Sequence, residues 1–218
     1  MSAIIPIVVS LFSLFVSGLV AWLTLLRTGT VRMTQPTIIF FGPDGGNGAP
    51  KVFLRTLLYS TAHRGCIVES MFVKLRRGES RQTFNIWVYG DGRMARGSGL
   101  FVGHQGVACN HHFLLPKDGT SFEFLAGDYR LEIYATLVSQ KQPVLLHETR
   151  VTLAPTDADA MRARKAGTYF DWGPDSGKYH PYVDDPPKRL RKHSDLAQLV
   201  AELEETFPKG QAKNEDET

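Results

Sequence analysis

The chain has no charge at its start, few cysteines and none of the common catalytic motifs. All 47 Lys, Arg, Asp and Glu among its 218 residues lie after residue 26. The only cysteines are Cys66 and Cys109, which favours a domain that does not depend on disulfides, in a reducing compartment. No Walker, kinase, His-Glu-x-x-His or Gly-x-Ser-x-Gly signature occurs, and there is no Asn-x-Ser/Thr acceptor. The enzyme classes marked by those motifs are therefore excluded.

The first feature that is present is a run of 23 uncharged residues, Ile4 to Leu26. A helix of this length spans the roughly 30 Å hydrocarbon core of a bilayer. A cleaved signal peptide would instead have a basic start, a shorter apolar core and a small-residue cleavage site, and the sequence shows none of these. We therefore predict a transmembrane anchor over residues 1–27, with residues 4–26 in membrane lipid, followed by a linker over 28–35.

Positive charge indicates the orientation of this anchor. No Lys or Arg precedes the apolar run, whereas Arg27 and Arg32 follow it. Because Lys and Arg next to a span favour the cytoplasmic side, we expect a single-pass protein with its N-terminus outside and its C-terminal domain in the cytoplasm. If the domain were outside, Cys66 and Cys109 would be candidates for a disulfide between sheets.

Residues 36–155 read as a β-domain. Short runs of alternating apolar and polar residues are separated by Gly, Asp and Pro clusters, and no helical pattern lies between them. The segment FLAGDYRLEIYATL is the clearest example, with Tyr129, Leu131, Ile133 and Ala135 on one face. This turn, Tyr and alternating strand resemble the late strands of immunoglobulin-like sandwiches. The expected fold is all-β, an immunoglobulin-like antiparallel sandwich behind the transmembrane helix, with a C-terminal loop and short helix.

Alternation also predicts the two faces of individual strands. In residues 67–75 it groups Ile67 and Glu69 with Met71, Val73 and Leu75, and places Val68 on the opposite face. Residues 83–89 read as one continuous strand. Both expectations assume an unbroken period of two.

The tail, residues 156–207, combines a loop with short helices. Thr156 is a candidate cap for a helix over Asp157–Lys165, which Gly167 ends. The next stretch lacks regular periodicity and is rich in aromatic residues. It either covers a face or an edge of the sandwich or forms a partner-binding surface. The candidate partner-binding residues are Tyr169, Phe170, Trp172, Tyr179 and Tyr182.

A basic run follows, and then an amphipathic helix over Asp195–Phe207 capped by Ser194. The basic run is either a solvated surface or a contact with anionic lipid headgroups. Residues 208–218 are expected to be disordered. The candidate headgroup ligands are Lys188, Arg189, Arg191 and Lys192.

One segment carries candidate chemistry. His104, Cys109 and His111 have side chains that bind zinc, but alternation sends His112 to the opposite face and the spacing matches no established zinc motif. A nucleophilic pair of Cys109 with His111 or His104 is the other reading. We predict no metal, no cofactor and no catalytic residue.

The sequence supports a binding role more than a catalytic one. Residues 27–155 carry 15 basic and 9 acidic side chains, without any nucleic-acid-binding signature, so we expect no nucleic-acid partner. The expectation is a membrane-anchored sandwich that binds or scaffolds a protein partner. The alternatives are a tethered enzyme or metal-binding domain that uses His104, Cys109 and His111, and an accessory subunit of a membrane complex.

Overall fold

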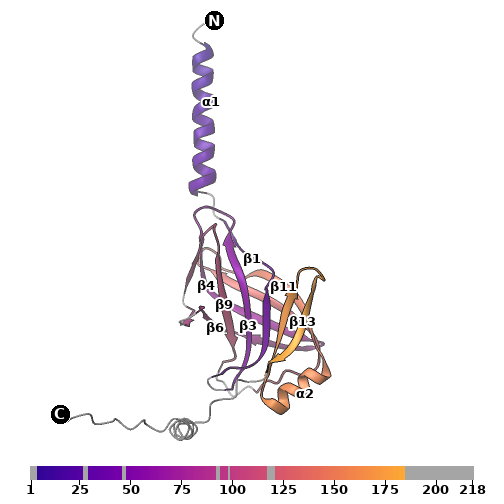
Figure 1. Ribbon diagram of the computed structural model, residues 1–218. Coiled ribbons are helices and arrows are strands. Elements are labelled where there is room, and N and C mark those ends of the chain that lie inside the picture. Colours follow the sequence, from indigo (N-terminus) through magenta and orange to yellow (C-terminus); the bar gives the residue numbers. More distant parts are fainter. Residues whose placement is uncertain are drawn as a thin grey trace, which may run out of the picture. The chain divides into compact units, whose positions relative to one another are not determined.

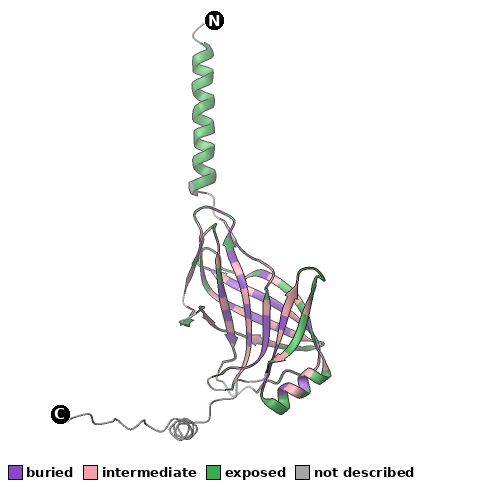
Figure 2. Ribbon diagram, viewed as in Figure 1, coloured by how far each residue is buried: buried purple, intermediate pink, exposed green. Residues whose placement is uncertain are grey.

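The computed structural model describes residues 4–26, 29–45, 48–91, 94–97, 99–116 and 121–184. Its first element is an apolar helix, α1 (Ile4–Ala21), continued by one π-helical segment, η1 (Trp22–Leu26). None of the residues of α1 is buried (Figure 2). The span is long and apolar enough to cross a membrane, a test that a signal sequence near the N-terminus also passes.

The strands that follow this helix form two antiparallel sheets, as the short alternating runs predict (Figure 1). The larger sheet has eight strands, in spatial order β13 (Lys178–Asp184), β12 (Gly167–Gly173), β2 (Ile38–Pro43), β3 (Pro50–Ser60), β9 (Val107–Leu114), β6 (Ile86–Tyr89) and β7 (Ala95–Arg96), with β1 (Val31–Met33) also paired to β3. The smaller sheet has the order β11 (Val144–Leu153), β10 (Gly127–Leu137), β4 (Cys66–Arg77) and β5 (Ser80–Phe84), with β8 (Leu100–Val102) paired to β4.

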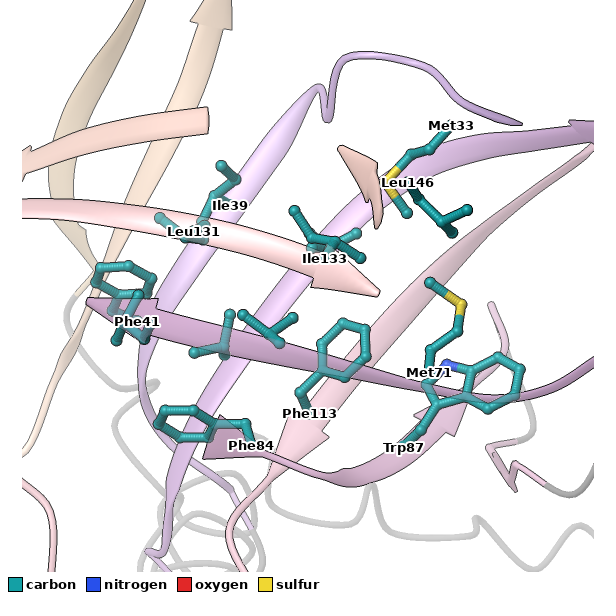
Figure 3. Packing of buried hydrophobic residues seen from close by; sticks show 14 of the residues in the cluster. Met33, Ile39, Phe41, Met71, Phe84, Trp87, Phe113, Leu131, Ile133 and Leu146 are labelled. Carbon is teal, nitrogen blue, oxygen red and sulfur yellow. The ribbon is translucent and has the colours of Figure 1, made fainter. Parts of the chain in front are cut away.

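A single apolar core joins the two sheets. In β3, Val52, Leu54, Thr56 and Leu58 are buried while the residues that alternate with them are not, so alternate side chains point into the core. β10 does the same from the other sheet, which confirms the predicted buried face of that strand. Figure 3 shows side chains of both sheets, such as Phe113 and Ile133, converging in the space between them.

Strand β4 departs from a simple period of two. In β4, Val68 is buried together with Met71, whereas Ile67 is 48% exposed, because the pairing with β10 shifts register between Thr136 and Leu137. A bulge of this kind inserts one residue and reverses the alternation beyond it. The predicted face of Ile67 and Val68 is therefore wrong.

The run over residues 83–89 is also not one strand. It divides at Asn85 into β5, which pairs with β4 in the smaller sheet, and β6, which pairs with β9 in the larger. The chain thus crosses from one sheet to the other, and Phe84 and Trp87 both enter the core. This crossing places Trp87 beside β9.

The sheet extends past residue 155, where the sandwich was expected to end. After α2 (Pro155–Arg164), β12 and β13 form a hairpin that pairs with β2 and becomes the edge of the larger sheet. The short helix is confirmed, but it begins at Pro155 with Ala154 as its N-cap rather than with Thr156. Proline is well suited to the first turn, where no N–H partner is lost. Lys165, in the left-handed conformation, ends the helix.

Candidate functional site

Two of the candidate zinc-binding or nucleophilic residues, Cys109 and His111, lie on the inner face of β9. The two side chains are neighbours, with 3.4 Å between Cys109 Sγ and His111 Nε2. On the other side of the imidazole ring, the indole N–H of Trp87 donates a hydrogen bond of 3.1 Å to His111 Nδ1. His111 is fully buried, so these two contacts define its chemistry.

The Trp87 hydrogen bond fixes the tautomer of His111. An indole N–H can only donate, so Nδ1 must accept, and the proton of the neutral ring then lies on Nε2. His111 Nε2–H consequently donates toward the sulfur of Cys109. A base that activates a thiol needs the opposite arrangement, with a free lone pair facing the sulfur. The pair is therefore arranged as a buried structural contact.

Burial keeps both groups uncharged at neutral pH. It lowers the pKa of His111 to about 4, with a further contribution from His112, and it raises the pKa of Cys109 to about 11, with a further contribution from Asp91. A thiolate–imidazolium pair is thus disfavoured at both partners. Trp87 is itself held close by Gly97, where a Cβ would collide with the indole ring.

The third candidate residue, His104, lies apart from this contact. It is exposed in the turn before β9, and its ring packs against His63 with 4.6 Å between centroids. Among the residues that the structure describes, no three His, Cys, Asp or Glu side chains are grouped closely enough to hold a metal ion. His104, Cys109 and His111 therefore do not form one site.

The five aromatic candidates of the tail divide between the two faces of the β12–β13 hairpin. Phe170 is 1% exposed and packs on Phe41 in the core, so it is not available to a partner. The Tyr179 hydroxyl donates to the carbonyl of Pro36, and Trp172 packs edge-on against the Tyr179 ring. These three residues mainly secure the hairpin to the rest of the sheet.

Tyr169 and Tyr182 lie on the opposite, outward face. The two rings stack with 5.3 Å between centroids, and Tyr169 packs on Phe40 of β2 at 4.6 Å. Tyr182 is 47% exposed. The prediction that these two tyrosines bind a partner is untested, and the structure leaves Tyr182 accessible.

Strand register extends this pair into a line of side chains across the larger sheet. Direct pairing connects Tyr182 to Tyr169, Tyr169 to Phe40, Phe40 to Phe53, Phe53 to His112 and His112 to Val88. The His112 ring packs on Phe53 at 4.8 Å. We call this line the aromatic row; it consists of Tyr182, Tyr169, Phe40, Phe53, His112 and Val88.

The aromatic row is uncharged at neutral pH, and ion pairs flank it. Burial, followed by the nearby aspartates, raises the pKa of both Tyr169 and Tyr182. Burial, with Lys51 as the next cause, lowers the pKa of His112 to about 4. Lys51 pairs with Asp44 at 3.3 Å and lies over the Phe40 ring, and Arg55 pairs with Asp91 at 2.9 Å.

The sequence reading missed Phe40, Phe53 and His112 as members of this surface. Each lies in a run that was correctly read as β-rich, and alternation places Phe53 and His112 opposite the buried residues of their strands. No signal within one strand shows that they are neighbours of Tyr169, because adjacency depends on the pairing of distant strands.

The tail beyond residue 184 lies outside the described residues. This holds for the expected helix over 195–207, for the expected disorder over 208–218 and for the four candidate lipid ligands, Lys188, Arg189, Arg191 and Lys192.

Comparison of the chain with protein-family models, with curated proteins and with solved structures finds no match.

Proposed function

We propose that this chain is a single-pass membrane protein whose β-sandwich binds a protein partner through the aromatic row. The observation that carries the proposal is the direct register of Tyr182, Tyr169 and Phe40 on the outward face of the larger sheet, with Tyr182 47% exposed. Helix α1, apolar and exposed along its whole length, is the proposed anchor.

The composition of this face supports a protein as the occupant. Protein interfaces combine an aromatic centre with a polar rim and are enriched in Tyr, Phe and Arg. Here the row supplies the aromatic centre, and the pairs Lys51–Asp44 and Arg55–Asp91 supply a rim of both signs. Such a rim favours a partner with an apolar centre and mixed charge around it, rather than a polyanion.

The sandwich is proposed to be of the immunoglobulin-like type. The Tyr129 hydroxyl accepts from the Leu125 N–H at 2.9 Å and donates to the Leu125 carbonyl at 2.6 Å. In immunoglobulin-like sandwiches, a tyrosine at a strand corner bonds back to the backbone a few residues upstream in this way.

The test compares two tyrosine variants of the full chain extracted in neutral detergent. Tyr182→Ala removes an exposed ring of the row, whereas Tyr59→Ala removes an exposed ring elsewhere on the outward face of β3. A partner that co-purifies with wild type and Tyr59→Ala should be lost from Tyr182→Ala, because interface tyrosines often contribute about 2 kcal/mol or more.

Retention of the same partner by Tyr182→Ala would contradict the proposal. Sedimentation of the purified chain tests whether the surface instead binds a second copy of the chain. A homodimer would also contradict the proposal of a heterologous partner. A partner recovered at fixed stoichiometry would further identify the chain as an accessory subunit of a membrane complex.

A further inference from the structure

The outward face of the smaller sheet carries a second line of side chains, and these are all arginines. Direct pairing connects Arg150 of β11 to Arg130 of β10, Arg130 to Arg76 of β4, and Arg76 to Arg81 of β5. We call these four residues the arginine row. Like charges directly opposite each other destabilise a sheet, so the row lowers the stability of the fold unless something else compensates.

Glu132 compensates part of this charge. It is 3% exposed, and its Oε1 lies 3.2 Å from Arg76 Nε and 3.3 Å from Arg130 Nε. Both Nε atoms are buried and lack a well-aligned hydrogen bond, so these contacts are electrostatic and leave N–H donors unsatisfied. Arg130 Nη2 also contacts Glu148 Oε2 at 2.7 Å. The guanidinium groups of Arg76 and Arg130 are thus held in place but keep N–H donors without a hydrogen-bond acceptor.

Arg150 differs from these two. It is exposed, and within the described residues it has no carboxylate partner. With Arg76 and Arg130 it lines a surface hollow of about 320 Å³, together with Gly78, Asp128 and Tyr129. The Asp128 carboxylate accepts a hydrogen bond of 2.6 Å from the Thr152 hydroxyl.

We propose that this hollow binds a phosphate group through Arg76, Arg130 and Arg150. Opposed residues of an antiparallel sheet stand about 4.5–5.5 Å apart, so the three guanidinium forks gather over a small area. A phosphate presents several strong acceptor oxygens to several forks at once, whereas one carboxylate is saturated by a single fork. The contact of Glu132 with two of the arginines pre-organises them for such a ligand.

The site does not depend on the proposed partner surface, because it lies on the other sheet and uses no residue of the aromatic row. Loss of phosphate binding with partner binding intact refutes only the phosphate site. Loss of partner binding with phosphate binding intact refutes only the proposed function.

The test is calorimetric titration of the full chain, in phosphatidylcholine nanodiscs, with inorganic phosphate at constant ionic strength. Arg150→Gln is the informative variant, because Arg150 is exposed and its removal leaves the ion pairs of Glu132 intact. We expect saturable binding that this variant weakens by about tenfold or more. Arg150→Lys should recover only part of the affinity, because it keeps the charge and loses the fork.

Arg64→Gln is the matched control, an exposed arginine in the turn before β4 that should bind phosphate as wild type does. The proposal is overturned if wild type and Arg150→Gln bind phosphate with equal affinity. It is also overturned if the titration with phosphate releases no more heat than a titration with chloride. Nanodiscs with about one fifth phosphatidic acid separate the two sources of phosphate. A lipid headgroup in the hollow suppresses the titration, whereas an unchanged titration assigns the hollow to a soluble phosphate ligand.

Discussion

Acid should destabilise the fold in part through a fully buried histidine, His111. Its pKa falls from 6.5 in a solvated chain to about 4 in the folded protein, chiefly because burial disfavours the charged ring. Since the folded pKa is the lower one, folding favours the neutral form. The resulting stabilisation is complete above pH 6.5 and is lost as the pH falls toward 4.

The magnitude follows from linkage between protonation and folding. At pH 4.5 the unfolded imidazole is almost fully protonated and the folded one is mostly neutral, so the contribution of His111 alone lowers the free energy of unfolding by about 2.5 kcal/mol relative to pH 7.5. The Trp87 hydrogen bond to Nδ1 also disfavours protonation of His111, because a protonated ring would direct its own N–H at the indole N–H.

Urea denaturation of the full chain in neutral detergent, followed by circular dichroism at pH 7.5 and pH 4.5, measures this loss. His111→Gln should lose about 2.5 kcal/mol less than wild type between the two pH values, since its amide does not titrate. His104→Gln removes an exposed imidazole and is the control for the loss of one histidine. If His111→Gln and wild type lose the same free energy, the assignment of a neutral, buried His111 is incorrect.

Three further outcomes are expected. In a Cys66→Ser background, Cys109 should resist alkylation at neutral pH until the protein unfolds, because burial raises its pKa to about 11; rapid labelling of the folded chain would show an accessible thiolate. Phe170→Ala should lower the free energy of unfolding by about 3–5 kcal/mol, and Tyr182→Ala by less than about 1 kcal/mol, so equal melting temperatures would contradict their placement in core and surface. A reporter active only outside the cytoplasm, fused after Thr218, should be inactive, and activity would reverse the predicted orientation.

Several features that depend on local sequence alone were predicted correctly. The charge-free run over Ile4–Leu26 determines an apolar helix, because no charged group interrupts its length. The alternation in β10 assigns Tyr129, Leu131 and Ile133 to the core, since successive side chains of a strand point to opposite faces. The placement of Cys109 and His111 on one face follows from the same rule.

The predictions that were wrong have a common cause. The periodicity of a strand does not determine which other strands lie beside it. The bulge that buries both Val68 and Met71 arises from pairing with β10, and the switch at Asn85 arises because β5 and β6 pair with different sheets. The tail hairpin likewise becomes regular only because β2 offers it an edge. Its own sequence has no clear alternation.

Both proposed surfaces are also products of tertiary structure. The sequence by itself determined that Phe40 and Phe53 would be apolar side chains in β-rich runs, that Tyr182 would be an aromatic residue of the tail, and that Arg76 and Arg130 would be charged. Only the register of strands far apart in the chain aligned the first set into the aromatic row and the second into the arginine row. The physical reason is that the rows run perpendicular to the strands, along the direction of the hydrogen bonds, where chain order carries no information.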